Sequence, residues 1–229
     1  MFDAGYYSDD SGIFSSQRRA YREKAQGPYR SVVKPVCDLL LALAMLPLLA
    51  PVIALLWALV RMDGGPGFFG HRRIGKNGKV FRCWKIRTMV PNAEAKLQQH
   101  LAANPAARAE WARDHKLTDD PRITRLGRFL RETSLDELPQ IWNVLTGEMS
   151  FVGPRPVVRA EITKYGIHRT AYLLMKPGIT GLWQVSGRND VTYAERVEMD
   201  VRYLNDQSLA TDSRLLLLTA KSVLGRTGR

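Results

Sequence analysis

The chain has 229 residues, of which 45% are hydrophobic and 24% are charged. This composition excludes an intrinsically disordered chain, and the length suffices for one domain with its own core, a membrane element and tails. The 34 Lys and Arg residues outnumber the 22 Asp and Glu residues, so the formal net charge is +12. Such an excess favours an anionic partner: a nucleic acid, an anionic bilayer or a phosphorylated substrate. The two cysteines exclude a disulfide framework and predict reduced thiols in a cytosol-facing protein.

The N-terminal part of the chain divides into a tail and a membrane segment. Residues 1–33 show no period of apolar positions, and we predict a flexible basic tail there. Residues 39–60 contain no charge. At about 1.5 Å per residue, these 22 residues would form a straight helix of roughly 33 Å, enough to cross the hydrocarbon core. The run is too long and begins too far into the chain for a signal peptide, so we predict a membrane helix over residues 34–61.

Two features of this helix argue against a simple crossing. Pro47 and Pro51 lie in its middle, where each removes a backbone donor and crowds the preceding turn. Basic residues flank both ends, in residues 17–34 and 71–87, although a spanning helix normally has its Lys and Arg excess on the cytoplasmic side alone. A helix broken at the prolines that enters and leaves through the cytoplasmic leaflet satisfies both flanks. A kinked helix that spans the membrane is the alternative.

A β-hairpin is predicted after the membrane helix. Residues 64–67 are a turn signal, and short runs follow at residues 68–74 and 79–86. The loop between the runs ends in Asn77-Gly78, a pair that suits a tight hairpin because both positions tolerate positive φ. The basic side chains of the hairpin would form a cationic ribbon that holds lipid headgroups or, near a nucleotide or lipid phosphate, binds the substrate.

Helical patterns occupy much of the rest. Residues 93–113 predict two exposed helices, interrupted by Pro105. Residues 214–226 are amphipathic and basic, as expected of a helix in the headgroup plane. Four arginines at three-residue spacing would share one broad helical face, either solvated or turned toward phosphate: Arg122, Arg125, Arg128 and Arg131.

Residues 131–156, RETSLDELPQIWNVLTGEMSFVGPRP, contain a pair of adjacent acids, Asp136 and Glu137. One interpretation is structural. Ser134 and Glu137 match a capping box with Ser134 as the N-cap, and Asp136 would then lie in the first helical turn, where the helix dipole favours an acid. This interpretation explains both acids without catalysis.

The other interpretation of the acidic pair is chemical. Arg131 precedes the acids, and Arg155 follows them in a rigid Gly-Pro-Arg-Pro loop. Carboxylates beside a phosphate need a metal ion or proton chemistry to avoid repulsion. Carboxylate, Mg²⁺ and arginine together form the usual apparatus of phosphoryl transfer.

The stretch SLDELPQIWNVLTGEMSFVGPRP resembles the signature of the bacterial sugar transferases, which are small monotopic phosphoglycosyl transferases that begin the assembly of capsules and exopolysaccharides. Lys34 and Asp38 before the membrane run, FRCWKIRTM at residues 81–89 and PGITGLWQVSGRN at residues 177–189 are similar to the family in the same order. The resemblance covers about residues 34–225. The chain departs from the family where Ala50-Pro51 replaces the frequent Ser-Pro of the helix break, and where Lys34 is followed by Pro35 and not by Arg.

The resemblance implies a mainly helical α+β fold: a monotopic membrane protein with one proline-broken re-entrant helix, a small β-hairpin and amphipathic interfacial helices around a cytoplasmic active site. Residues 62–229 would be the transferase domain, on the cytoplasmic face of the bacterial inner membrane. The enzyme would transfer a sugar-1-phosphate from a UDP-sugar to undecaprenyl phosphate, a polyprenyl phosphate. We expect a hexose such as glucose or galactose, from the general likeness to chains of this length.

The resemblance also implies roles for individual residues. Asp136 would be the nucleophile that attacks the sugar-linked phosphate, expels UMP and forms a phosphosugar–aspartyl intermediate. Asp136 would bind Mg²⁺, and Glu137 would assist either the placement of Mg²⁺ or proton transfer. The expected phosphate-binding and substrate-binding residues are Arg131, Arg155, Lys85, Arg87 and Arg188. Trp183 would pack near the substrate or, alternatively, belong to the core.

Two functions from other classes compete with this one. A membrane-tethered nucleic-acid-binding protein would explain the charge, but the sequence contains no recognisable nucleic-acid module, and we expect no nucleic-acid partner. A non-catalytic membrane scaffold would leave the acidic pair without a purpose. The four histidines are scattered, and no function is assigned to them.

Overall fold

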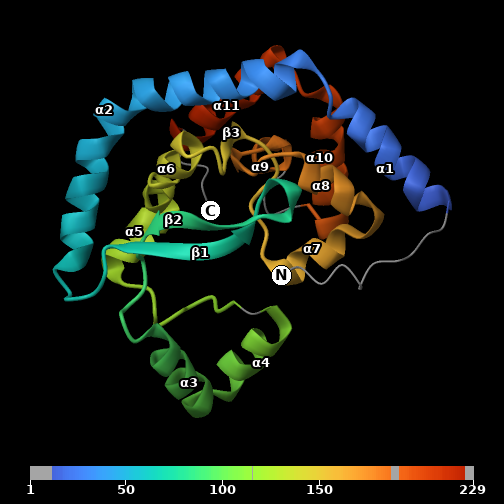
Figure 1. Ribbon diagram of the computed structural model, residues 1–229. Helices are drawn as coiled ribbons and strands as arrows, with labels where there is room; N and C mark the ends of the chain where they lie inside the picture. The colour runs from blue at the N-terminus through green and yellow to red at the C-terminus, as the bar shows by residue number, and fades with distance from the viewer. Residues whose placement is uncertain (1–11, 115, 187–190, 225–229) are drawn as a thin grey trace.

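The structure, a computed structural model, describes residues 12–114, 116–186 and 191–224. Figure 1 shows a mainly helical molecule in which a long bent helix runs over a body of short helices and a small hairpin. The mainly helical α+β class is confirmed, as are the hairpin and the long apolar helix near the N-terminus.

Helix α1 (Gly12–Lys24) and a π-helical segment, η2 (Tyr29–Val33), lie where the sequence predicted a flexible tail. That prediction is wrong for residues 12–33, and residues 1–11 lie outside the described part of the chain. Tyr21 explains the difference, because its ring is buried in the main hydrophobic cluster and its hydroxyl contacts His168 Nδ1 at 2.7 Å. One aromatic anchor is too weak a periodic signal to be recognised from the sequence.

Helix α2 (Lys34–Arg61) has the bounds that the sequence predicted. Pro47 and Pro51 lie inside it, and the helix is continuous but bent into two arms (Figure 1). Helix bends of this kind are usually caused by proline, which removes a backbone hydrogen bond and crowds the preceding turn. Much of its surface is apolar and exposed, with Leu40, Leu48 and Leu55 each at least 60% exposed. By length and composition, the helical segment Tyr29–Arg61 could cross a membrane.

Both strands of the predicted hairpin form. Strands β1 (Phe68–Ile74) and β2 (Val80–Ile86) pair in antiparallel register from Phe68 with Ile86 to Ile74 with Val80. The turn contains η3 (Lys76–Gly78), where Asn77 and Gly78 have φ values of 58° and 76°. The positive φ expected of this pair is therefore observed.

The middle of the chain is helical. Helices α3 (Ala93–Ala103) and α4 (Pro105–Asp114) are the two predicted exposed helices, and they project from the body in Figure 1. Helix α5 (Arg125–Glu132) carries three of the four spaced arginines. Arg122 precedes this helix and forms a bidentate ion pair with Asp120, so the four arginines do not share one helical face.

The remaining elements complete the body. The 3₁₀ turn η4 (Leu135–Glu137) leads into α6 (Gln140–Leu145), and strands β3 (Ser150–Val152) and β4 (Gly178–Thr180) form a two-stranded parallel sheet that the sequence did not predict. The helices between and after these strands are α7 (Arg159–Ile162), η5 (Thr163–His168), α8 (Arg169–Leu174), α9 (Leu182–Ser186), α10 (Tyr193–Asp206) and α11 (Leu209–Leu224). The main cluster of buried side chains joins β2, α6, β3, α10 and α11.

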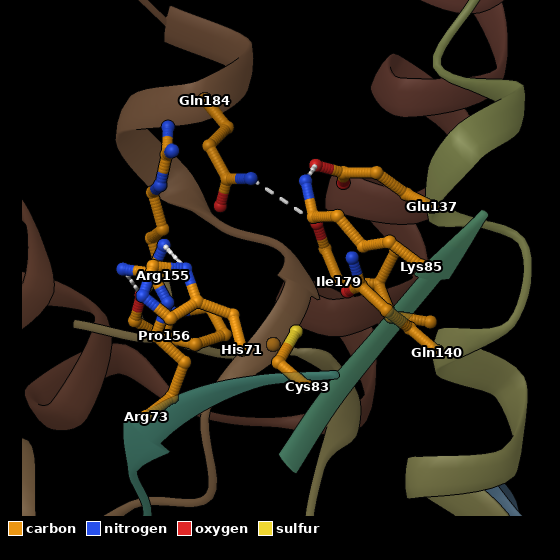
Figure 2. A pocket seen from close by; sticks show the side chains of 11 residues that line it. His71, Arg73, Cys83, Lys85, Glu137, Gln140, Arg155, Pro156, Ile179 and Gln184 are labelled. Atoms are coloured by element: carbon orange, nitrogen blue, oxygen red, sulfur yellow. Dashed lines mark hydrogen bonds and ion pairs between the residues drawn. The ribbon is translucent and has the colours of Figure 1, made fainter. Parts of the chain in front are cut away.

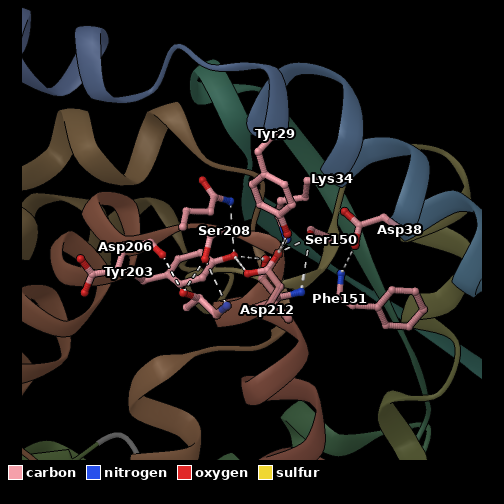
Figure 3. Close-up of polar contacts among 12 residues, drawn as sticks. Tyr29, Lys34, Asp38, Ser150, Phe151, Tyr203, Asp206, Ser208 and Asp212 are labelled. Carbon is pink, nitrogen blue, oxygen red and sulfur yellow. Dashed lines mark hydrogen bonds and ion pairs between the residues drawn. The ribbon is translucent and has the colours of Figure 1, made fainter.

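Buried polar contacts attach the beginning of α2 to this body (Figure 3). Lys34 Nζ lies 2.5 Å from Asp212 Oδ2, and the hydroxyls of Tyr29 and Tyr203 donate to the same carboxylate at 2.7 Å. The backbone N–H of Phe151 donates to Asp38 Oδ1 at 3.1 Å. The Lys34 and Asp38 positions therefore fasten the apolar helix to α11 and to β3.

Candidate functional site

The backbone places the acidic pair in a tight 3₁₀ turn. Asp136 and Glu137 lie in η4, and Pro139 is the N-cap of α6. Ser134 has a left-handed backbone (φ 57°), and its side chain caps nothing, so the predicted capping box is wrong. Its backbone N–H donates to Arg131 O at 3.2 Å, which makes Ser134 the left-handed residue that ends α5. Asp136 does lie in the first turn, as predicted.

Lys85 bridges the two acids. Its Nζ lies 2.6 Å from Glu137 Oε1 and 3.6 Å from Asp136 Oδ2. The Asp136 side chain is 10% exposed, whereas that of Glu137 is 35% exposed. Burial raises the pKa of Asp136 above its ordinary value and the negative charge of Glu137 adds to this, while the positive charges of Lys85 and Arg131 oppose it. Asp136 is therefore a shielded and basic carboxylate, and Lys85 favours its ionised form.

A pocket of about 410 Å³, which includes the open space at its mouth, adjoins the acidic pair (Figure 2). Its walls come from the hairpin, from η4 and α6, from the loop after β3 and from the segment that begins at β4. The lining residues are His71, Arg73, Cys83, Lys85, Glu137, Gln140, Arg155, Pro156, Gly178, Ile179 and Gln184. Asp136 is not among them and adjoins the pocket through Glu137 and Lys85. Of the residues that the structure describes, three cations line the pocket, Arg73, Lys85 and Arg155, which suits a polyanionic ligand.

Close backbone contacts hold the 153–156 loop, which carries Arg155. Gly178 N donates to Pro154 O at 2.8 Å, and Gly153 N donates to Thr180 O at 2.9 Å. A Cβ atom on Gly178 would lie 2.1 Å from Gly153 N, so only glycine fits at this position. The loop therefore presents the exposed Arg155 side chain at the pocket from a fixed backbone.

Sequence reasoning missed Arg73 and His71. Arg73 Nη1 donates to Pro156 O at 3.1 Å and ties the hairpin to the 153–156 loop, while His71 Nδ1 lies 3.2 Å from Arg73 Nη2. The alternation of side chains along a strand could have found both residues. Residues two apart share a face, so His71 and Arg73 lie on one face of β1, and His71 pairs with Cys83 of β2. The same face carries Lys85, which was predicted.

Two of the predicted phosphate-binding residues have other contacts. Arg87 donates to both carboxylate oxygens of Asp63 and to the carbonyls of Val60, Pro66 and Met89, so it fastens the end of α2 and does not line the pocket.

Arg131 Nε donates to Thr88 Oγ1 at 2.9 Å, and its charge lies close enough to lower the pKa of Asp136, although it does not line the pocket either. Arg188 lies outside the described residues. Trp183 is 6% exposed with Arg196 stacked on it at 4.6 Å, which makes it a core residue. The predicted wall from this segment is supplied by Gly178, Ile179 and Gln184 instead.

The acidic pair offers suitable donors for Mg²⁺. Within the described residues, no group of three or more His, Cys, Asp or Glu side chains is arranged to hold a metal ion. Mg²⁺ is commonly held by one or two carboxylates together with the phosphates of a substrate. Asp136 and Glu137 provide such carboxylates beside a cationic pocket, so these residues fit an ion that arrives with a phosphorylated substrate.

Comparison with known proteins gives a consistent result. The model of the family described as bacterial sugar transferase matches residues 29–226. The chain is 48% identical to an undecaprenyl-phosphate galactose phosphotransferase of Salmonella typhimurium, over 97% of this chain and 47% of that protein. It is 50% identical to a UDP-galactose-lipid carrier transferase of Erwinia amylovora, over 86% of this chain and 41% of that protein. It is also 48% identical to the exopolysaccharide production protein ExoY of Sinorhizobium fredii, over 86% of this chain and 87% of that protein. The chain thus spans less than half the length of the first two relatives and most of the third.

Proposed function

Because the chain belongs to the bacterial sugar transferase family, we propose that it is an enzyme that transfers a hexose-1-phosphate from a UDP-sugar to undecaprenyl phosphate and releases UMP. Relatives named as undecaprenyl-phosphate galactose phosphotransferase and as UDP-glucose:undecaprenyl-phosphate glucose-1-phosphate transferase support this substrate pair. The product would be the lipid-linked sugar that begins the assembly of an exopolysaccharide or a related glycan. ExoY, a relative of similar length, is named for exopolysaccharide production.

The observation that carries the proposal is the acidic pair, bridged by Lys85 beside a pocket lined by arginines. A structural ion pair would need one acid, whereas this site holds two and buries one of them. The burial of Asp136 has an energetic cost, which is expected of a reactive group and is not expected of a surface helix cap.

In the first half of the proposed reaction, an oxygen of the ionised Asp136 attacks the phosphorus atom attached to the sugar. The new P–O bond forms as the bond between this phosphorus and the UMP oxygen breaks, so UMP leaves with its electron pair. Arg155 binds the phosphate oxygens from its fixed loop. Lys85 keeps Asp136 ionised and Glu137 paired before the donor arrives.

In the second half, a phosphate oxygen of undecaprenyl phosphate attacks the same phosphorus atom. The aspartyl P–O bond breaks and returns the carboxylate of Asp136, and the sugar becomes attached to the lipid through a diphosphate. Covalent catalysis suits this site because an ionised Asp is already a nucleophile and needs no separate base.

Asp136 and Glu137 would hold Mg²⁺ together with the phosphates of the donor. The ion would supply positive charge that reduces repulsion between the carboxylates and the diphosphate.

We further propose that α2 is re-entrant and does not span the membrane. Both of its ends are fastened to the same body: Lys34 pairs with Asp212 of α11, and Arg87, which directly follows β2, binds the carbonyl of Val60. A helix that crossed the bilayer would leave its ends on opposite sides, where one small domain could not hold both. The bend at Pro47 and Pro51 and the exposed apolar surface support insertion from one leaflet.

The proposed arrangement places residues 62–229, a membrane-associated transferase domain, on the cytoplasmic face of the bacterial inner membrane. Large apolar side chains are exposed on several helices of this body, as expected of interfacial elements. They include Phe129 of α5, Trp142 of α6, and Leu217 and Leu218 of α11.

The test of this function is release of UMP by the purified protein. Given UDP-glucose or UDP-galactose, Mg²⁺ and undecaprenyl phosphate, the protein should produce UMP and a lipid-linked sugar phosphate in equal amounts. Release of UDP would indicate transfer of the sugar alone and would contradict the proposal, as would the absence of any nucleotide product. For topology, tags at residues 10 and 229 should both report the cytoplasmic side, and opposite sides would mean a full crossing.

A further inference from the structure

His71 lies on the wall of the pocket that faces the acidic pair. Figure 2 shows His71, Arg73 and Arg155 on one side of the pocket, with Lys85 and Glu137 on the other. His71 is half-buried on β1, and none of the roles described above for the reaction uses it.

The contact between His71 and Arg73 defines which ring nitrogen carries the proton. His71 Nδ1 lies 3.2 Å from Arg73 Nη2. A guanidinium group has only donors, so Nδ1 must accept this hydrogen bond and cannot carry a proton. In a neutral imidazole the proton is then on Nε2. His71 therefore has one nitrogen committed to the protein and an N–H donor left at the other.

The surroundings of His71 hold it in this form. Arg73 is itself fixed, because its Nη1 donates to Pro156 O at 3.1 Å and lies 3.5 Å from Glu161 Oε2. Burial lowers the pKa of His71, and the positive charges of Arg73 and Lys85 lower it further, while the negative charge of Glu161 opposes them. The imidazole thus stays neutral and oriented near pH 7.

We propose that His71 is a substrate-binding residue that donates its Nε2–H to an oxygen of the sugar-diphosphate portion of the nucleotide sugar. This inference rests on the proposed function and adds a residue to that site. A neutral donor differs from the surrounding cations because it binds an acceptor without adding charge. It therefore suits recognition of a particular oxygen, whereas Arg155 and Lys85 attract any polyanion.

Two oxygens could accept this bond: a phosphate oxygen or a hydroxyl of the sugar. Binding measurements with UDP and with the UDP-sugar distinguish them, because UDP lacks the hexose and therefore the hexose hydroxyls. Loss of the donor should weaken binding by roughly 3- to 10-fold for a neutral hydroxyl and by roughly 10- to 100-fold for a charged phosphate oxygen.

Two substitutions of His71 test the proposal. His71→Ala removes both nitrogens. His71→Gln retains an amide oxygen that can accept from Arg73 and an NH₂ group that can donate into the pocket. His100→Ala, on the projecting helix α3, is the matched control. For each variant, KM and kcat for the UDP-sugar, dissociation constants for UDP and the UDP-sugar, and the melting temperature are measured in the same detergent.

We expect His71→Ala to raise KM by the factor given above with a smaller change in kcat, and His71→Gln to recover most of the loss. An equal loss with UDP identifies a phosphate oxygen as the acceptor, and a loss with the UDP-sugar alone identifies a hydroxyl. A KM for a folded His71→Ala protein within twofold of wild type would overturn the proposal. So would a His71→Gln variant with wild-type melting temperature that binds as poorly as His71→Ala. Wild-type activity is measured in parallel, so failure of the proposed function would appear separately, as absence of UMP.

Discussion

Replacement of Lys85 by methionine should make the activity of the enzyme depend strongly on pH. Methionine has a similar length but no charge, so the substitution removes the cation that lies 3.6 Å from Asp136 and 2.6 Å from Glu137. At 3.6 Å, the attraction between unit charges is about 1 kcal/mol in bulk water and about 5 kcal/mol at an effective dielectric constant of about 20. Because the Asp136 side chain is only 10% exposed, the true value should lie well above the bulk-water limit.

The positive charge of Lys85 favours the ionised form of Asp136. The pKa of Asp136 is already raised by burial, and Lys85 opposes that rise. Without Lys85, the pKa of Asp136 rises further, so the carboxylate is protonated over a wider range of acidic pH and loses its nucleophilicity there. Each 1.4 kcal/mol of lost attraction changes the ionisation equilibrium of Asp136 about tenfold. UMP release should therefore fall at least about tenfold on the acidic side. It should recover partly as the pH rises.

The assay is the pH profile of kcat/KM for UMP release, which reports ionisation in the free enzyme and is measured at UDP-sugar concentrations well below KM, for the wild type, Lys85→Met and Lys85→Arg. Arginine keeps the charge and should leave the acidic limb close to that of the wild type. Lys79→Met, at the exposed end of the hairpin, is the control for loss of a charge elsewhere. A loss in Lys85→Met that is equal at every pH would refute the reasoning, because it would show that Lys85 acts by position and not through the ionisation of Asp136.

Three further substitutions have defined outcomes. Asp136→Asn should reduce UMP release by at least about a thousandfold. The melting temperature of this variant should stay equal to or above that of the wild type, because a buried charge is removed. Near-normal turnover would exclude Asp136 as the nucleophile. Gly178→Ala places a Cβ atom 2.1 Å from Gly153 N, so the 153–156 loop must move. The variant should lose about 1–3 kcal/mol of stability and most of the activity. Wild-type stability and activity would contradict the close fit. Lys34→Met leaves the buried Asp212 without its cation and should lower the free energy of unfolding by about 3 kcal/mol. Addition of Asp212→Asn should restore part of that loss, and purely additive effects in denaturation would show that the two residues are not coupled.

Local signals predicted most of the elements. Asn77-Gly78 specified the hairpin because few other pairs accept two positive φ values, and both are observed. The uncharged run at residues 39–60 and the charged residues on either side of it gave the bounds of α2, which begins at Lys34 and ends at Arg61. The short parallel pair of β3 and β4 was missed because three-residue strands that are 25 residues apart leave no periodic pattern.

Ser134 shows why a matching motif is not sufficient. A serine three residues before a glutamate fits the start of a helix, but the same serine also follows the last turn of α5. The tight 3₁₀ turn and Pro139 leave the acids at the turn itself, and Ser134 takes the left-handed conformation that ends the preceding helix. The motif alone does not decide between these alternatives; in the structure, the N–H of Ser134 donates to Arg131 O and its side chain caps nothing.

The basic residues of the site were the hardest to sort. The sequence offers many arginines, and charge alone does not tell which are free to meet a substrate. Arg155 was found because prolines and glycines fix its loop, whereas Arg87 is occupied by Asp63 and by backbone carbonyls that only the fold brings together. His71 gave no signal by itself, because its orientation depends on Arg73 and, through it, on Pro156.

The central claim is that Asp136 becomes esterified to the sugar-linked phosphate. The most direct test is mass spectrometry of the enzyme incubated with UDP-sugar and Mg²⁺ in the absence of the lipid acceptor. A hexose-phosphate adduct should appear on the peptide that contains Asp136, at up to one per chain and with an equal amount of UMP, and it should disappear when undecaprenyl phosphate is added. An enzyme that turns over with both substrates but neither forms this adduct nor releases UMP without the acceptor would contradict the account.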